Sequence, residues 1–102
     1  MVDAAAEQGD ILKVEGIAAP VLVVSKTFFN QSGMAICCPI AAYAAPGPLH
    51  IEIDHASYRG IVLCEYMKLT DLRFRGYKKA GAISLAQIMD ISDAIQGIFE
   101  YI

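Results

Sequence analysis

The pattern of hydrophobic and polar positions divides the chain into several short apolar segments and one amphipathic segment. Residues 20–25 (PVLVVS) and 34–40 (MAICCPI) are nearly unbroken apolar runs, typical of strands buried on both faces. Residues 49–53 alternate apolar and polar side chains, which favours a half-buried strand. Residues 9–15 (GDILKVE) and 59–66 (RGIVLCEY) are predicted as two further strands.

The segments between these runs carry turn signals. Residues 26–33 (KTFFNQSG) contain Asn and Gly and leave room for one helical turn. Residues 41–48 end in Pro46-Gly47-Pro48 and are predicted as a loop. Residues 71–79 are interpreted as a basic connection.

The amphipathic segment predicts one helix at the C-terminal end. Ser84 is a good N-cap, and Gln87 three residues later completes a capping box. An apolar stripe follows at helical spacing and consists of Ile88, Ile91, Ile95 and Ile98. Three further apolar residues lie close to it: Leu85, Phe99 and Ile102. We expect the stripe to pack on the strands, although a second subunit could cover part of it. Five or so short strands and this helix predict a mainly β, strongly bent antiparallel barrel, formed by a single domain over 1–102.

Composition adds an excess of apolar surface. Hydrophobic residues make up 56% of the chain and the mean hydropathy is +0.46, so part of that surface is expected to meet a partner. No apolar run approaches the ~20 residues of a membrane span, so no membrane partner is expected. The N-terminal residues (MVDAAAEQGD) lack the basic and apolar regions of a signal peptide, which predicts a cytoplasmic protein.

Charge is distributed unevenly along the chain. The net charge of -3 argues against a generally basic nucleic-acid-binding protein. Residues 59–79 nevertheless contain six basic and two acidic side chains, a local charge of +4 against -7 elsewhere. This basic stripe can attract a polyanion or an acidic peptide, or it can be an ordinary solvated loop face.

The cysteines are an odd number and have apolar neighbours. Cys37, Cys38 and Cys64 are therefore predicted to be buried free thiols rather than a disulfide framework. No CxxC or paired His/Cys spacing indicates zinc, and no metal or other cofactor is expected.

Several segments occur in an order and spacing that is specific as a set, although each alone is common. They are GDILKV at 9–14, PVLVVS at 20–25, Asn30, SGMAICCPI at 32–40, PGPLHIEI at 46–53, GIVLCEYMK at 60–68, and 71–84 before the final helix. In these segments the chain resembles the MazF/PemK/Kid family of type II toxin–antitoxin systems. The resemblance implies an SH3-like barrel, a homodimer, metal-independent sequence-specific cleavage of single-stranded mRNA, and an antitoxin that wraps the dimer.

The same resemblance implies two catalytic positions that carry alanine in this chain. The family places an arginine before the PVLVV-type strand and a threonine after the CPI-type strand, where this sequence has Ala19 and Ala41. The family's reaction, attack of a ribose 2'-OH on the adjacent phosphate, needs proton transfer and stabilisation of charge. A methyl group supplies neither, so cleavage is predicted to be weak or lost. The connection before Pro20 is also shorter than the family's usual first loop.

The other side of the expected RNA groove keeps its basic residues. Lys68, Arg73 and Arg75 match basic positions of the family, and Tyr66 or Phe74 could stack on a base, although core packing is the commoner role of such rings. His50 and Glu52 share one face of a strand and could act as an acid–base pair, but a solvent-facing pair is favoured.

Three functions remain open from the sequence. The first is a ribonuclease toxin with activity through an altered site. The second, favoured by Ala19 and Ala41, is a silent homologue that binds RNA or an antitoxin as a regulatory or decoy dimer. The third is a gyrase-directed toxin on the same barrel, for which the sequence carries no positive marker.

Overall fold

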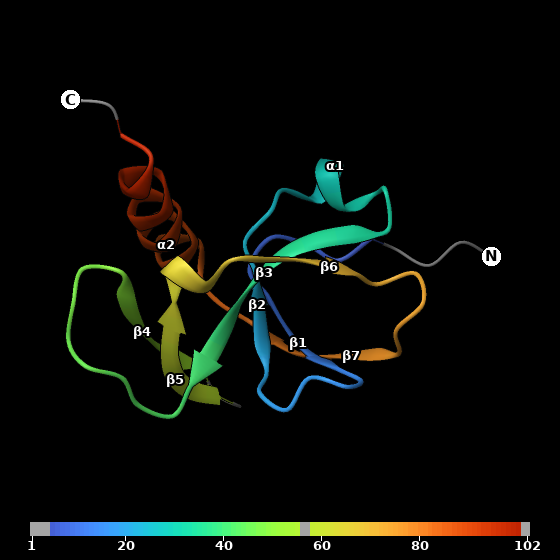
Figure 1. Cartoon of the computed structure of the whole chain (residues 1–102), viewed down its shortest axis with the longest axis horizontal. Helices are drawn as coiled ribbons and strands as arrows, with labels where there is room; N and C mark the ends of the chain where they lie inside the picture. Colours follow the sequence, from blue (N-terminus) through green and yellow to red (C-terminus); the bar gives the residue numbers. More distant parts are fainter. Residues whose placement is uncertain (1–4, 56–57, 101–102) are drawn as a thin grey trace.

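The structure is a computed structural model that describes residues 5–55 and 58–100 and consists of one curled sheet with a C-terminal helix (Figure 1). The strands are β1 (Asp10–Val14), β2 (Val21–Val23), β3 (Met34–Ala41), β4 (His50–His55), β5 (Tyr58–Leu63), β6 (Lys68–Asp71) and β7 (Tyr77–Ala82). The helices are α1 (Thr27–Asn30), the 3-10 turn η1 (Cys64–Tyr66) and α2 (Leu85–Ile98). The mainly β fold with a C-terminal helix is confirmed.

The long strand β3 organises the sheet. The strand order is β4-β5-β3-β2-β1-β7, every pairing is antiparallel, and β6 also pairs with β3. One edge of β3 is shared, since Ile40 pairs with Val62 of β5 while Ala35 pairs with Thr70 of β6. This division bends the sheet and curls it into a half-barrel.

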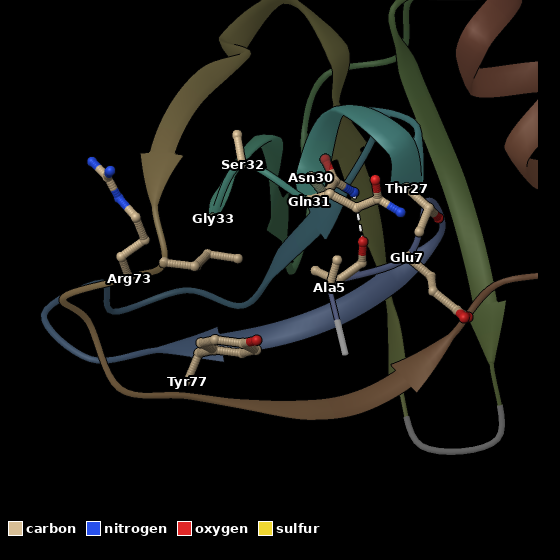
Figure 2. Close-up of a pocket in the computed structure, with 11 residues that line it drawn as sticks. Ala5, Glu7, Thr27, Asn30, Gln31, Ser32, Gly33, Arg73 and Tyr77 are labelled. Atoms are coloured by element: carbon tan, nitrogen blue, oxygen red, sulfur yellow. Dashed lines mark hydrogen bonds between the residues drawn. The ribbon is translucent and has the colours of Figure 1, made fainter. Parts of the chain in front are cut away.

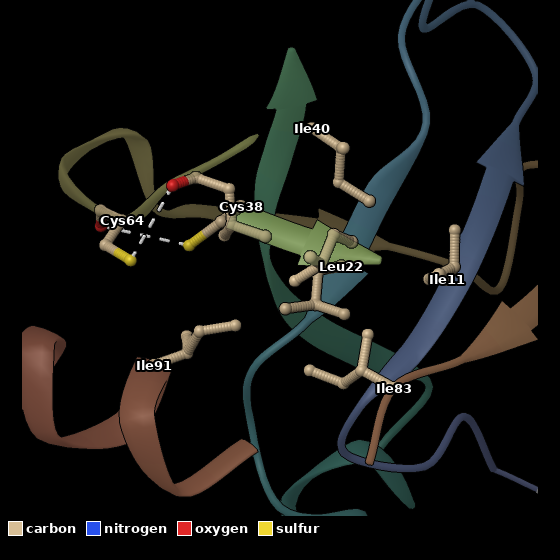
Figure 3. Packing of buried hydrophobic residues seen from close by; sticks show 9 residues of the cluster. Ile11, Leu22, Cys38, Ile40, Cys64, Ile83 and Ile91 are labelled. Atoms are coloured by element: carbon tan, nitrogen blue, oxygen red, sulfur yellow. Dashed lines mark hydrogen bonds between the residues drawn. The ribbon is translucent and has the colours of Figure 1, made fainter. Parts of the chain in front are cut away.

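The sheet has a hydrophobic cluster on each face, and β3 contributes to both. Cys38 and Ile40 belong to the cluster that Ile91 of α2 closes, which Figure 3 shows from close by. Ala35 and Cys37 belong to the second cluster, on the face away from α2. The run MAICCPI is therefore continuously apolar because alternate side chains enter different cores.

Helix α2 begins where the sequence predicts it and packs through part of the expected stripe. The Ser84 hydroxyl accepts a hydrogen bond from the Gln87 N–H at 3.2 Å, as a capping residue should. Ile91 is only 2% exposed, and Ile88 and Ile95 pack against the same cluster. Ile98 is 38% exposed, so the apolar stripe is less buried towards the end of the helix. Ile102 lies outside the described residues.

Two predicted elements are wrong in their extent. Strand pairing of the 59–66 segment stops at Leu63, because the chain turns through η1 before returning to β3 as β6. The segment 71–79 is not one connection: it spans the end of β6, a loop, and the start of β7. YKKAGA has weak strand propensity, and its pairing with β1 rather than its own composition makes it a strand.

The three cysteines are buried free thiols, as predicted. Burial raises the pKa of Cys38 to about 12 and that of Cys64 to about 11, so both stay protonated near neutrality. These thiols serve as core side chains.

Candidate functional site

The two alanines at the expected catalytic positions lie where β2 begins and β3 ends. Val21 pairs with Pro39, and the Ile40 N–H donates to the Pro20 carbonyl at 3.0 Å. Ala19 and Ala41 are the next residues beyond that hydrogen bond, and Ala41 shares with Cys37 the face of β3 away from α2. Ala19 and Ala41, 22 residues apart in the sequence, thus lie near each other in the fold, and each contributes only a methyl group.

Lys68 is the predicted RNA-binding residue that shares this face. It pairs with Cys37 on β3, so their side chains project to the same side of the sheet. Cys37 lies four residues before Ala41, about 13 Å at the usual rise of a strand. Lys68 is exposed and makes no ion pair in the described part of the chain.

Arg73 lies further away and is already engaged. It follows β6 beyond Asp71, which pairs with Met34 at the opposite end of β3 from Ala41. Its guanidinium binds the Asp71 carboxylate through two hydrogen bonds of 3.0 and 2.8 Å, which hold the pKa of that carboxyl at about 2. The guanidinium also sits 5.2 Å from the centre of the Phe74 ring. The Asp71 carboxylate and the Phe74 ring therefore offset part of the positive charge of Arg73.

Arg75 is brought to the turn that precedes Ala19. Its Nη1 donates to the Glu15 carbonyl at 3.3 Å, and a Cβ on Gly16 would lie 3.5 Å from the same nitrogen. Gly16 has a positive φ of 83°, which glycine adopts without strain. Arg75 thus stabilises the six-residue turn between β1 and β2.

Tyr66 and Phe74 are exposed, so core packing is the wrong interpretation for both rings. Tyr66 is 62% exposed at the end of η1, and Phe74 is 84% exposed in the loop after β6. Both rings are available for stacking, but they belong to different parts of the surface.

His50 contacts Glu65 rather than Glu52. Its Nδ1 lies 2.5 Å from the Ala45 carbonyl, and its Nε2 lies 2.9 and 3.1 Å from the two Glu65 carboxylate oxygens. The Ala45 carbonyl and an ionised Glu65 carboxylate are both acceptors, so this arrangement favours the positively charged imidazole, in which both ring nitrogens donate. The Ala45 carbonyl and, next, the Glu65 carboxylate accordingly raise the pKa of His50. The ring ties the loop before β4 to η1.

We expect the contribution of His50 to stability to depend on pH. Because its folded-state pKa is raised above the usual 6.5, the stabilisation is complete below pH 6.5 and is lost as pH rises through the folded value. The free energy of unfolding of wild type minus that of His50→Gln should therefore fall between pH 6 and pH 9. Chemical denaturation at each pH measures this difference, and a difference that rises with pH would contradict the charged state.

Two open cavities lie near β7. The larger, about 780 Å3, is shown in Figure 2; α1, the N-terminal segment, Arg73 and Tyr77 line it. The smaller, about 450 Å3, is lined by residues of β1, the following turn and β7, including Lys13, Ala19 and Lys78. The proximity of Lys13 and Lys78 carries no signal in the sequence, since the two residues meet only through the β1–β7 register.

The described residues hold neither a cluster of metal ligands nor a membrane-spanning helix. No group of three or more His, Cys, Asp or Glu side chains converges there as metal ligands would. Of the helices described, none has the length and hydrophobicity needed to cross a membrane.

Comparison with known proteins agrees with this architecture. The endoribonuclease toxin ChpB of Escherichia coli K12 is 31% identical over 111 residues, covering 92% of this chain and 94% of ChpB. Among solved structures, a MazE-MazF structure from Deinococcus radiodurans superposes with a TM-score of 0.86 at 18% identity, covering 95% of this chain and 98% of the other. A mycobacterial endoribonuclease in complex with its cognate antitoxin gives a TM-score of 0.79 at 16% identity, covering 93% and 95%.

The family match extends over almost the whole described chain. Residues 7–99 match the family described as PemK-like, MazF-like toxin of type II toxin-antitoxin system. This range includes all seven strands and α2. The chain therefore belongs to the PemK-like, MazF-like toxins of type II toxin–antitoxin systems.

Proposed function

We propose that this chain is a cytoplasmic toxin-family homodimer that binds single-stranded RNA and an antitoxin but cleaves RNA weakly or not at all. The observation that carries this proposal is that Ala19 and Ala41 are the residues next to the Pro20–Ile40 hydrogen bond, just beyond the β2–β3 ladder. Both positions offer only methyl groups where the family's reaction needs a cation and a hydroxyl. Loss of a single transition-state donor typically costs on the order of 10²–10³ in rate.

Neither Glu52 nor His50 is placed to replace the missing side chains. Glu52 pairs with Ile61, which pairs with Ala41, so its carboxylate lies two strands away, about 10 Å. Both nitrogens of His50 are engaged by Ala45 and Glu65. These contacts argue against an acid–base pair at the alanines in the described part of the chain.

RNA binding without cleavage has separate support. Lys68 lies on the same face of the sheet as Ala41, is exposed, and makes no ion pair in the described residues. Tyr66, two residues before Lys68, is also exposed. Arg75 lies at the turn leading to Ala19. We assign phosphate binding to Lys68 and Arg75 and base stacking to Tyr66, with Arg73 contributing less because Asp71 neutralises it.

A homodimer is supported by helix α2. Leu85 and Met89 are 71% and 57% exposed and lie one turn apart on α2, next to the row that packs on the sheet, and Phe99 at the C-cap is 71% exposed. Such an apolar row on a small protein favours burial against a second copy.

The proposal is tested by comparing purified chain with ChpB on the same mixed-sequence single-stranded RNA. We expect RNA binding by both proteins, cleavage by ChpB, and cleavage at least about 10²-fold slower by this chain. Comparable cleavage by both would show that an altered site retains activity and would refute the silent homologue. An absence of RNA binding by this chain would refute the RNA part of the proposal.

A further inference from the structure

We propose that the cavity of about 780 Å3 beside α1 is a subsite for a guanine base of single-stranded RNA, stacked on Tyr77 and recognised by Arg73. The inference deepens the RNA-binding part of the proposed function and rests on that part alone. The cavity lies between α1 and the turn after it, the N-terminal segment at residues 5–7, and the chain from the end of β6 to the start of β7 (Figure 2). Its lining includes neither alanine of the expected reaction site, so it is a separate place on the surface.

Tyr77 gives the cavity an aromatic surface. It begins β7, pairs with Val14 of β1, and is 36% exposed. In Figure 2 the Tyr77 ring lies along one side of the cavity, and the exposed polar residues Gln31 and Ser32 lie along the other. Because every base has an aromatic face, an exposed ring beside an open cavity is a platform on which a base can stack.

Hydrogen bonds of buried Asn30 hold the wall opposite Tyr77 in place. Asn30 is 3% exposed, and its Nδ2 donates to the Ala6 carbonyl at 2.6 Å and to the Ser25 carbonyl at 3.1 Å. The Ser25 hydroxyl accepts the Ile36 N–H at 2.9 Å, which connects the wall to β3. The N-terminal segment and α1 are thus joined to the sheet, so the cavity is preformed, as binding sites for small groups usually are.

Arg73 is fixed at one end of the cavity. The Asp71 carboxylate accepts hydrogen bonds from Arg73 Nε at 3.0 Å and from Nη2 at 2.8 Å. A Cβ on Gly33 would overlap the Arg73 Cγ, so the side chain crosses a position that only glycine leaves open. The guanidinium also lies 5.2 Å from the centre of the Phe74 ring. The guanidinium is therefore held in one orientation before any ligand arrives.

The contacts of Arg73 suit a neutral acceptor better than a phosphate. Asp71 offsets its charge but engages only Nε and Nη2, and no hydrogen bond in the described part of the chain engages Nη1. A guanidinium fork pairs with two acceptors in one plane, and guanine presents O6 and N7 in this way on one edge. Adenine has one acceptor and one donor there. Single-stranded RNA leaves that edge accessible.

Glu7 makes the cavity unfavourable for an anion. It lines the cavity across from Arg73 and is exposed, and it makes no ion pair among the residues described (Figure 2). With Arg73 already paired to Asp71, the charged groups around the cavity do not add up to a phosphate site. An uncharged base is therefore favoured over a phosphate or an acidic side chain.

The cavity is within reach of an RNA strand that contacts Lys68. Lys68 pairs with Cys37 and Asp71 with Met34, three residues along β3, or about 10 Å at the usual rise of a strand. Arg73 follows two residues after Asp71. Neighbouring nucleotides of one extended strand can therefore place a phosphate at Lys68 and a base in the cavity.

The test measures fluorescence anisotropy of labelled uridine heptamers with the full chain. The central nucleotide is guanosine, adenosine or 7-deazaguanosine. We expect the guanosine RNA to bind about five- to tenfold more tightly than the adenosine RNA. The 7-deazaguanosine RNA should lose most of this preference, because it keeps the ring that stacks but lacks the N7 acceptor.

Substitutions assign the preference to the two side chains. Arg73→Lys keeps the charge but not the fork, so the ratio of guanosine to adenosine affinity should fall close to one. Arg59→Lys is the matched control, because Arg59 is also exposed and paired with an aspartate, Asp54, and does not line the cavity; the ratio should not change. Tyr77→Ala should weaken both RNAs about fivefold or more, and Tyr77→Phe should not. A ratio within one variant is insensitive to partial unfolding.

Salt dependence separates a base contact from a phosphate contact. The charge-matched double variant Asp71→Asn, Arg73→Gln should leave the slope of log affinity against log salt unchanged, whereas Lys68→Gln should reduce it by about 0.7. A smaller slope for the double variant would overturn base recognition by Arg73, and so would a guanine preference that survives Arg73→Lys. Binding of GMP as tight as that of the guanosine RNA would overturn RNA as the source of the base. RNA binding without a guanine preference would refute this inference alone, while no RNA binding at all would refute the RNA part of the proposed function.

Discussion

The double substitution Ala19→Arg, Ala41→Thr should convert the chain into an active ribonuclease. We expect cleavage of single-stranded RNA to rise on the order of 10²–10³-fold or more, because each side chain restores a group that stabilises charge on the reacting phosphate. The hydrogen bond between Pro20 and Ile40 already brings the two positions to neighbouring places at the end of the sheet. Ala19 lines a cavity of about 450 Å3 with room for a longer side chain, and threonine suits the strand position of Ala41. Gel analysis of RNA products and growth of cells expressing the variant measure the gain.

The neighbouring alanines provide a matched control. Ala18→Arg, Ala42→Thr adds the same groups one residue away from the two positions that the family's reaction uses. This control should stay as inactive as wild type. If it gained as much activity as the first variant, a general increase in positive charge would explain the result rather than a restored site. If neither variant cleaved RNA, the assignment of Ala19 and Ala41 as the catalytic positions would be wrong.

Ile91→Ala should cause a large loss of stability. Ile91 is 2% exposed and joins α2 to the cluster of Leu22, Cys38 and Val62 (Figure 3). Truncation of a buried isoleucine leaves a cavity and costs about 2–5 kcal/mol of unfolding free energy. For a domain of this size the Tm should fall by roughly 10 °C or more, measured by calorimetry or circular dichroism.

Leu85→Ala on the same helix is the control for this prediction. Leu85 is 71% exposed, so its loss should change the unfolding free energy of the monomer by no more than about 0.5 kcal/mol. Equal destabilisation by the two variants at low protein concentration would contradict the packing of α2 described above. A larger effect of Leu85→Ala on dimer dissociation than on monomer unfolding is the expected result for a row that meets a second copy.

The elements with strong local signals were predictable from the chain. The buried strands of 20–25 and 34–40, the single turn of α1 and the start of α2 after Ser84 all follow from apolar runs, turn residues or a cap. Strands β6 and β7 were not predictable as such, because their lysines and glycines have low strand propensity and only pairing with β3 and β1 orders them. The end of β5 at Leu63 likewise depends on where β3 changes partner.

For the candidate site, too, the residue types could be predicted from the sequence, whereas their contacts could not. The identities of Ala19, Ala41, Lys68, Arg73, Arg75 and Tyr66 come from the sequence, and so does the expectation that the reaction lacks its usual groups. Side-chain contacts in the folded protein decide which basic side chains remain free. Asp71 neutralises Arg73, the Glu15 carbonyl holds Arg75, and the partner of His50 is Glu65 rather than the nearby Glu52.

The mainly β class, the buried thiols, the capped helix and the family follow from local patterns and from the order of segments along the chain. The approach of Ala19 to Ala41 and the position of Lys13 opposite Lys78 depend instead on how the strands pair. The tertiary structure also decided which lysines lack a counter-ion in the described residues. The reason is physical: strand register joins residues far apart in the chain, and charge neutralisation depends on distances of a few ångströms that no local pattern encodes.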